Sequence, residues 1–182
     1  MHDTDTRYIR HEGCDHIFFV GFLGAGKSTL ARNLGTLFRR DYVDTDRLVE
    51  RSLGKSVSEV FSQDGEGAFR DAETAALRRL SVRKSLLVSC GGGIIERPEN
   101  AELMHDMGVV VFLDGDLEDS LRQIQCPEKR PDLGTPDEAR RLFTHRRPLY
   151  ERAADITIDI RNRSFDEVCD SSAELLWERG LL

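Results

Sequence analysis

The sequence predicts an α/β protein of one domain that is built on a parallel sheet. Short apolar runs alternate along the 182 residues with stretches whose apolar side chains recur at helical spacing. Glycine-rich segments follow two of these runs, at residues 21–29 and 91–93, where an open parallel sheet places its ligands. The composition, 39% apolar and 32% charged, is ordinary for a globular domain with its own core.

Five segments are expected to be strands. The apolar run IFFV at residues 17–20 predicts a buried first strand, because strands of a parallel sheet are covered on both faces. Ile156, Ile158 and Ile160 alternate with polar residues, as expected of the fifth strand. The other three expected strands are residues 42–44, 86–88 and 109–113.

Helical patterns occupy the segments between these strands. Apolar residues recur at helical spacing from Leu30 to Phe38, and a second helix through residues 48–49 is expected to end at Gly54. Another helix opens at Pro98 and closes near Gly108. A longer helix is expected to carry Phe69, Ala72, Ala76, Leu77 and Leu80. The last helix is expected to carry Val168, Leu175, Leu176 and Trp177.

Capping residues mark where further helices start. In a capping box, a Ser or Thr and an acid three residues later satisfy each other's backbone N–H groups. One more helix is expected from about Asp116, before a loop that is rich in proline and charge. The capping pairs are Ser56 with Glu59, Thr135 with Glu138, and Ser164 with Glu167.

Charge and hydropathy argue against several functional classes. The net charge of −7 disfavours a wide nucleic-acid-binding face, and no apolar run reaches the ~18 residues of a membrane span. Residues 1–15 are polar and are expected to be a disordered extension before a single domain of residues 16–182. Four widely spaced cysteines are typical of a cytoplasmic protein with reduced thiols.

The segment GFLGAGKST at residues 21–29 fits a phosphate-binding P-loop, with Gly21, Gly26, Lys27 and Ser28 at the required spacing. Its glycines let backbone N–H groups point at phosphate oxygens, and the helix that follows adds its positive end. Lys27 is expected to reach the β- and γ-phosphates, and Ser28 to bind Mg²⁺. The residues expected to bind ATP are Gly24, Ala25, Gly26, Lys27, Ser28 and Thr29.

The P-loop alone does not distinguish kinases from other nucleotide hydrolases, but two absences favour a small-molecule kinase. The sequence has no N-K-x-D guanine motif. The apolar run VVVFLD lacks the Asp-Glu pair of motor ATPases, so Asp114 and Asp116 are interpreted as a polar strand edge and a helix cap.

The acids of Asp44-Thr45-Asp46 follow the second expected strand and should therefore lie beside the P-loop. Because they alternate along the chain, one can face a metal while the other faces an acceptor hydroxyl. A carboxylate there can orient the hydroxyl and accept its proton during phosphoryl transfer. The alternative is a simple turn in which Asp46 caps the next helix.

Three further features could hold an acceptor. Gly91, Gly92 and Gly93 allow close backbone approach and offer N–H donors, although they could form only a flexible turn. Arg70 and Arg146 can each grip a carboxylate with two hydrogen bonds, although either could lie on a solvated helix face. Arg130, in the segment KRPDL, is placed to meet phosphate from a closing lid.

Taken together, these segments resemble the shikimate kinase family over nearly the whole chain after residue 16. The resemblance rests on GFLGAGKST, Asp44-Thr45-Asp46, G-x-x-x-x-F-R ending at Arg70, the triple glycine, K-R-P around Arg130 and R-R-P-L-Y from Arg146. It implies a three-layer α/β/α P-loop kinase fold with strand order 2-3-1-4-5, a helical substrate-binding segment at about residues 46–80 and a mobile lid at about 125–136.

The resemblance also implies transfer of the ATP γ-phosphoryl group to the 3-hydroxyl of shikimate, in the chorismate route to aromatic amino acids. Asp46 would contact the hydroxyls and act as base, Arg70 and Arg146 would grip the carboxylate, and residues 91–93 would line the pocket. Arg130 and Lys27 would meet phosphate. Mg²⁺ would be held by Ser28 and by Asp44 through water, while Arg163, with Arg122 as second candidate, would flank adenine.

The chain departs from the family pattern at two places. Asp132 stands where the family usually has leucine after the lid Arg-Pro, and Cys90 replaces a small or apolar residue before the triple glycine. The family precedent favours a monomer. The alternative functions are a gluconate-kinase-like or other small-metabolite kinase, and a nucleotide-binding regulatory module that has lost catalysis.

Overall fold

The computed structural model describes residues 15–123 and 135–182, and its centre is a five-stranded parallel sheet. The strands run in the order β2-β3-β1-β4-β5, as predicted. Each strand lies parallel to its neighbours, so all the carboxyl ends meet at one edge. The strands are β1 (His16–Val20), β2 (Tyr42–Asp44), β3 (Leu87–Ser89), β4 (Gly108–Asp114) and β5 (Ile156–Asp159).

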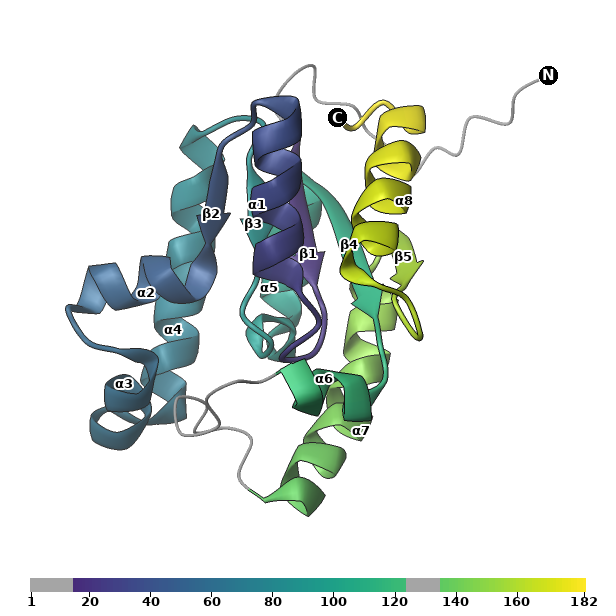
Figure 1. The fold of residues 1–182 in the computed structure, drawn as a ribbon. Helices are drawn as coiled ribbons and strands as arrows, with labels where there is room; N and C mark the ends of the chain where they lie inside the picture. The colour runs from purple at the N-terminus through teal and green to yellow at the C-terminus, as the bar shows by residue number, and fades with distance from the viewer. Residues whose placement is uncertain (1–14, 124–134) are drawn as a thin grey trace.

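Helices cover both faces of the sheet and give three layers (Figure 1). Side chains of α1 and α8 pack on one face, while those of α4, α5 and α7 pack on the other. The helices are α1 (Lys27–Phe38), α2 (Thr45–Leu53), α3 (Val57–Gln63), α4 (Gly65–Arg78), α5 (Pro98–Met107), α6 (Leu117–Gln123), α7 (Pro136–Ala153) and α8 (Phe165–Glu178), with the 3₁₀ helices η1 (Arg79–Val82) and η2 (Ile94–Glu96).

Alternation along β1 explains why the predicted first strand is buried on both sides. Phe18 and Val20 belong to the core under α4, α5 and α7, whereas Ile17 and Phe19 belong to the core under α1 and α8. All four side chains are almost fully buried. The first strand therefore joins the two cores and holds the glycine loop at its carboxyl end.

Helices α2, α3 and α4 form a smaller unit beside β2, on the side of the sheet away from α8 (Figure 1). Val49, Val60, Phe69 and Ala76 make its own apolar cluster. The predicted capping box of Ser56 and Glu59 starts α3, and Gly54, at φ 66°, ends α2. This small core fixes the start of α2 and the middle of α4 relative to the sheet.

Several predicted boundaries are wrong by one or two residues. The third strand is Leu87–Ser89 rather than 86–88, and the fourth extends to Gly108 and Asp114, because pairing with β1 sets its register. The fifth ends at Asp159, so Ile160 lies beyond it. Leu80 lies in η1 rather than in the long helix.

No helix in the described ranges is long and apolar enough to cross a membrane. The predicted extension at residues 1–15 lies almost wholly outside those ranges, as does most of the predicted lid at residues 125–136.

Candidate active site

The glycine loop joins β1 to α1, and its shape depends on positions where a side chain would not fit. Gly24 and Gly26 have φ values of 79° and 81°, in the left-handed region that favours glycine. A Cβ atom on Gly24 would overlap the backbone oxygen of Ser120, so the loop and α6 are in close contact. The loop therefore presents its backbone at the start of α1, as the P-loop pattern predicts.

Lys27 and Ser28 occupy the first turn of α1, and their side chains contact different groups. Lys27 is buried, and its Nζ donates to the backbone oxygens of Gly21 and Phe22 at 2.8 Å each. The ammonium group is thus held over the loop where phosphates would lie. Ser28 Oγ donates to Asp44 Oδ2 and shares a hydrogen bond with Ser89 Oγ, both at 2.8 Å.

The pair formed by Ser28 and Asp44 fits a Mg²⁺ site beside a nucleotide. A hydroxyl and a carboxylate are the hard oxygen ligands that Mg²⁺ prefers, and this ion usually adds phosphate oxygens and water to one or two protein ligands. The described residues contain no group of three or more His, Cys, Asp or Glu side chains that could hold a metal by themselves. The donor set therefore suits an ion that arrives with a triphosphate.

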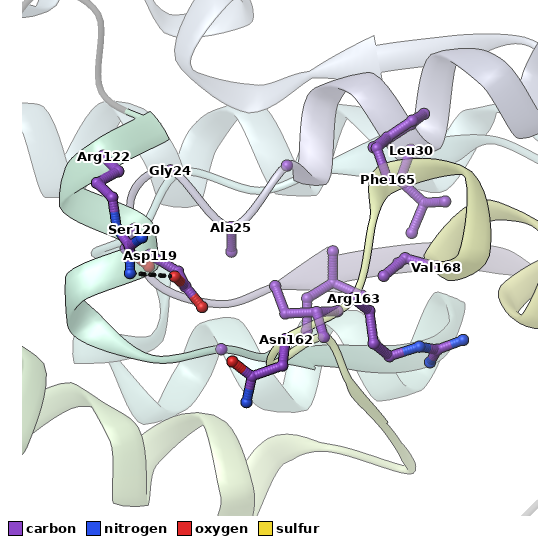
Figure 2. A pocket seen from close by; sticks show the side chains of 14 residues that line it. Gly24, Ala25, Leu30, Asp119, Ser120, Arg122, Asn162, Arg163, Phe165 and Val168 are labelled. Atoms are coloured by element: carbon purple, nitrogen blue, oxygen red, sulfur yellow. Dashed lines mark hydrogen bonds and ion pairs between the residues drawn. The ribbon is translucent and has the colours of Figure 1, made fainter.

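A cavity of about 270 Å³ opens next to the glycine loop (Figure 2). Gly24, Ala25 and Gly26 form one wall, and Asn162 and Arg163, which follow β5, form another. The position suits a nucleotide base and sugar whose phosphates lie on the loop. Arg122, the second adenine candidate, also lines the cavity, as does Phe165, which the sequence did not indicate.

Arg163 lines this cavity, but its guanidinium extends away from the glycine loop toward α8 (Figure 2). It donates to the backbone oxygens of Asp159 and Glu167 at 3.0 and 2.8 Å, and to Ser171 Oγ at 2.6 Å. Arg122 also lines the cavity and pairs with Asp119 of its own helix at 2.8 Å. Both predicted adenine neighbours thus reach the cavity, Arg163 mainly through its stem.

Asp44, Thr45 and Asp46 connect the nucleotide loop to the acceptor region. Asp44 is the N-cap of α2 and accepts from the backbone N–H of Arg47, so the alternative in which Asp46 caps this helix is wrong. Thr45 is buried, and its Oγ1 accepts from the backbone N–H of Gly91 at 2.8 Å. Asp46 lies in the first turn, and a Cβ on Gly91 would overlap its Oδ1.

The triple glycine is packed tightly against the predicted acceptor side chains rather than forming a free turn. A Cβ on Gly93 would overlap the guanidinium of Arg70, and one on Gly92 would lie 3.6 Å from Nη1 of Arg146. Together with the contact between Gly91 and Asp46, these positions bring all three predicted acceptor groups to one short backbone segment. Each group comes from a different helix, α2, α4 or α7.

Arg70 is buried and lies between two acids of its own helix, so the solvated-face alternative is wrong. Its Nη1 pairs with Glu73 Oε2 at 2.5 Å, and its Nη2 pairs with Glu66 Oε1 at 2.9 Å. Because Glu73 stands three residues after Arg70 and Glu66 four residues before it, both acids share its helix face. The guanidinium is thereby aimed at the triple glycine instead of at solvent.

Glu73 is a site residue that the sequence analysis missed. Its side chain is fully buried, and its Oε1 has no hydrogen-bond partner among the described residues. A Cβ on Gly91 would lie 2.9 Å from that oxygen, so it faces the same point as Asp46. Burial raises the pKa of Glu73 to about 7, an effect that Arg70 opposes and Asp46 reinforces. The i, i+3 spacing from Arg70 was the available signal.

Arg146 is also buried, although it lies within a helix rich in charge. Its Nε donates to Glu96 Oε1 at 2.7 Å, and Glu96 Oε2 contacts Nε2 of His145 at 3.0 Å. The next residue, Arg147, instead pairs with Asp114 at the end of β4 at 2.8 Å. Asp114 thus has a structural partner, which agrees with its interpretation as a polar strand edge.

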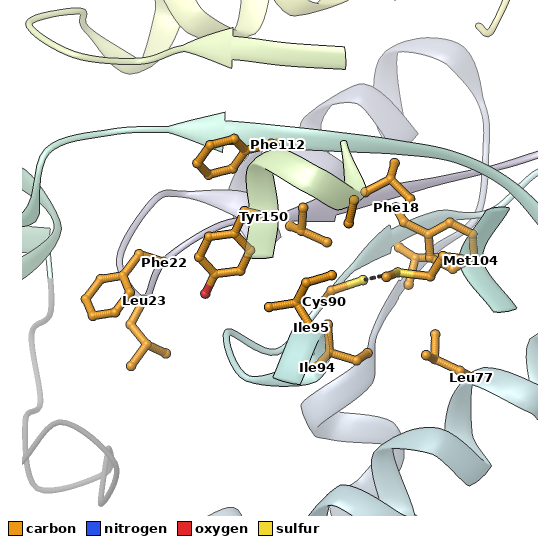
Figure 3. Packing of buried hydrophobic residues seen from close by; sticks show 14 of the residues in the cluster. Phe18, Phe22, Leu23, Leu77, Cys90, Ile94, Ile95, Met104, Phe112 and Tyr150 are labelled. Atoms are coloured by element: carbon orange, nitrogen blue, oxygen red, sulfur yellow. Dashed lines mark hydrogen bonds between the residues drawn. The ribbon is translucent and has the colours of Figure 1, made fainter. Parts of the chain in front are cut away.

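Tyr150 lies one turn after Arg146 on α7 and binds the backbone of the triple glycine. Its hydroxyl donates to the backbone oxygen of Gly92 at 2.5 Å, and its ring stacks on Phe112 of β4 (Figure 3). Cys90, just before the glycines, is buried with its Sγ 3.9 Å from Sδ of Met104 (Figure 3). Burial raises the pKa of this thiol, which therefore stays protonated and acts as a core side chain.

The predicted site residues that the structure describes lie in two adjoining halves, although the guanidinium of Arg163 turns away from the glycine loop and binds Glu167 and Ser171 of α8. The lid residue Arg130 and the departure at Asp132 lie outside the described residues. The phosphate half is centred on Lys27 and Ser28, the acceptor half on Asp46, and Asp44 stands between them. A triphosphate in one half would point its terminal phosphate toward an acceptor in the other.

Comparisons with known proteins point the same way. A family model described as shikimate kinase matches residues 23–177. The shikimate kinase of Dictyoglomus turgidum is 35% identical over 155 residues, which are 82% of this chain and 90% of that protein. The shikimate kinase of Vibrio parahaemolyticus is 36% identical over 167 residues, covering 90% and 97%. The solved structure of the enzyme from Acinetobacter baumannii in complex with shikimate has a TM-score of 0.86 at 32% identity, covering 94% of this chain and 97% of that one.

Proposed function

The chain belongs to the shikimate kinase family, whose members are ATP-dependent kinases, and we propose that it transfers the γ-phosphoryl group of ATP to the 3-hydroxyl of shikimate. One observation carries the proposal: Asp46, Arg70 and Arg146 converge on the triple glycine beside a P-loop. One carboxylate and two guanidinium groups match a substrate with three hydroxyls and one carboxylate. The product would be shikimate 3-phosphate, a precursor in aromatic amino-acid synthesis.

On the phosphate side, the backbone from Gly24 to Thr29 would hold the β- and γ-phosphates. Lys27 would exchange its two loop carbonyls for phosphate oxygens and offset the charge that develops during transfer. Ser28 and Asp44 would hold Mg²⁺, which would neutralise phosphate charge. Arg163 would flank adenine from the wall of the cavity, and Arg130 would meet the phosphates from the lid.

On the acceptor side, the oxygen of the 3-hydroxyl would attack the γ-phosphorus, and Asp46 would accept the proton of that hydroxyl. The bond from that phosphorus to the bridging oxygen breaks, and ADP leaves with the electron pair. Arg70 and Arg146 would hold the substrate carboxylate, with backbone groups of Gly91, Gly92 and Gly93 against the ring. A site built to pair hydroxyls can discriminate by ~10⁴ against molecules that leave its buried groups unpaired.

We further propose that the enzyme works as a monomer in the cytoplasm. Residues 16–182 would be one domain, with a substrate-binding segment at about 46–80 and a lid at about 125–136. The family resemblance supports these assignments. Light scattering on the purified protein, with and without both substrates, measures the oligomeric state directly.

Release of ADP tests the activity against its alternatives. We expect turnover with Mg-ATP to be low alone, to rise strongly with shikimate, and to respond little to quinate or gluconate. Stimulation by gluconate instead would favour a gluconate-kinase-like enzyme. Nucleotide binding without stimulation by any acceptor would favour the silent regulatory module.

A further inference from the structure

We propose that Glu96 is a positioning residue that orients Arg146 toward the carboxylate of the acceptor. This inference rests on the proposed function, because it concerns how the acceptor half of that site is preorganised. Glu96 ends η2, only three residues after the triple glycine, and reaches Arg146 across 50 positions of sequence. It touches the arginine and not the position of the reacting atoms.

Burial makes the partner of Arg146 important. The arginine is only 1% exposed, so its cation has little contact with water and depends on protein groups. Glu96 Oε1 accepts from its Nε at 2.7 Å, which is the geometry of a short charge-assisted hydrogen bond. Loss of this bond would remove one of the protein groups that fix the direction of the buried cation.

The contact with Glu96 is on one edge of the guanidinium, and the triple glycine is near another. Glu96 holds Nε, whereas Nη1 lies on the side of Gly92, 3.6 Å from where its Cβ would be. Because a guanidinium is planar, fixing Nε fixes the direction of both Nη groups. The bond to Glu96 therefore sets the plane in which Arg146 can meet a substrate carboxylate.

Glu96 is itself held in place. Its second oxygen contacts Nε2 of His145 at 3.0 Å, and the carboxylate is only 22% exposed. Burial opposes ionisation, but the hydrogen bonds from Arg146 and His145 outweigh it and lower the pKa of Glu96. The acid is therefore charged at neutral pH, and both its oxygens have partners on α7.

This arrangement also links the arginine to the glycine segment. Glu96 follows Gly93 through a single 3₁₀ turn, in which the N–H of Glu96 donates to the oxygen of Gly93. Tyr150, from the same helix as Arg146, binds the oxygen of Gly92. The loop and α7 are thus joined at two points, and the site needs less ordering when an acceptor binds.

Steady-state kinetics on Glu96→Ala and Glu96→Gln test the proposal. We expect Glu96→Ala to raise the KM for shikimate about 10-fold or more, and Glu96→Gln to raise it less because an acceptor oxygen remains. The KM for ATP should change less than about 2-fold. Glu99→Gln is the matched control, because Glu99 stands one turn further on and is about half exposed, with long contacts of 3.5–3.8 Å to Thr74, Arg97 and Arg78 and none to Arg146 among the described contacts.

Two further measurements separate positioning from a general loss of structure. The methyl ester of shikimate lacks the negative charge, so Glu96→Ala should reduce its kcat/KM by less than about 2-fold. In an Arg146→Ala background, Glu96→Ala should add no further increase in the KM for shikimate. Melting temperatures, together with the KM for ATP, report whether each variant is folded.

Several outcomes would overturn the inference. An unchanged or lowered KM for shikimate in Glu96→Ala would do so, as would equal losses for the acid and its ester, or additive effects with Arg146→Ala. These results can occur with an active wild-type enzyme and leave the proposed function intact. Absence of shikimate-dependent turnover in the wild type would instead overturn the proposed function, and this inference with it.

Discussion

At the scale of single residues, each cation that the acceptor half needs is accompanied by acids that the sequence analysis did not assign. Arg70 pairs with Glu66 and Glu73, and Arg146 pairs with Glu96. The cations are buried, and charges taken out of water require such partners. Asp46 has a different role, because its carboxylate faces the glycine backbone, where an acceptor hydroxyl would lie.

Replacement of Asp46 by Asn tests whether this carboxylate takes part in the chemistry. Asn keeps the size and one oxygen but cannot accept the hydroxyl proton, so we expect kcat to fall by about 10²-fold or more. The KM for ATP should change less than about 2-fold, because the nucleotide half is intact. A variant that retains most of its turnover would remove Asp46 from the reaction.

At the scale of elements, the acceptor half depends on how closely the triple glycine approaches α2 and α4. Thr45 binds the N–H of Gly91, and side-chain oxygens of Asp46 and Glu73 fill the space beside the Cα of Gly91. The contact joins the carboxyl end of the β3 segment to the small unit formed by α2, α3 and α4. Any side chain at Gly91 must therefore displace one of these carboxylates.

The variant Gly91→Ala tests this packing. We expect kcat/KM for shikimate to fall about 10-fold or more, because the new methyl group would overlap Asp46 Oδ1. Gly67→Ala is a matched control in α4, where an added Cβ meets nothing within 4 Å and the helix should gain roughly 0.5–1 kcal/mol. Similar kinetics for both variants would contradict the assignment of residue 91 to the acceptor pocket.

At the scale of the whole molecule, the site and a second set of polar contacts lie at opposite ends of the strands. The site lies at the carboxyl ends of the strands, whereas buried polar contacts tie the chain together at the amino ends. Arg40 donates to the backbone oxygens of Asp15, Ser85 and Leu181. His16, at the start of β1, accepts from the N–H of Leu86 through Nδ1 and contacts the oxygen of Leu80 through Nε2.

His16 predicts that the folded state weakens in mild acid. Burial lowers the pKa of His16 below the ordinary 6.5, and the charges of Arg40 and Arg83 add to this effect. The carbonyl of Leu80 and the charge of Asp15 oppose it. Below about pH 6.5 residue 16 then binds more protons in the unfolded chain than in the folded one, so the contribution of His16 to the free energy of unfolding falls as the pH falls. The bonds to Leu86 and Leu80 together fit a neutral ring that carries its proton on Nε2.

Denaturant unfolding at pH 7.5 and 5.5 measures this effect. Glu73, whose pKa is raised to about 7, takes up a proton in the folded state over that interval and favours folding in both proteins. The stability of wild type relative to His16→Gln, which cannot titrate at residue 16, should therefore fall between pH 7.5 and 5.5. Circular dichroism at pH 7.5 checks that the variant is folded, although we expect it to be less stable there. Parallel losses in both proteins would show that protonation of His16 is not responsible.

The local pattern of the sequence was enough to predict much of the fold and of the phosphate half of the site. Gly24 and Gly26 in the loop, the capping pair of Ser56 with Glu59, and the apolar run in β1 all act over a few residues. The resemblance carried by the longer set of motifs supplied the strand order and the family. The strand ends were less accurate, because register against a neighbouring strand decides them.

What the sequence determined by itself was the kind of site: a P-loop, two acids after the second strand, a triple glycine and arginines suited to a carboxylate. Only the tertiary structure decided that Arg70 and Arg146 are buried and which acids hold them. The bond between Glu96 and Arg146 spans 50 residues, and no local pattern encodes such a contact. The physical reason is that burial and ion pairing depend on which helices the sheet brings together, whereas caps and loops depend on their immediate neighbours.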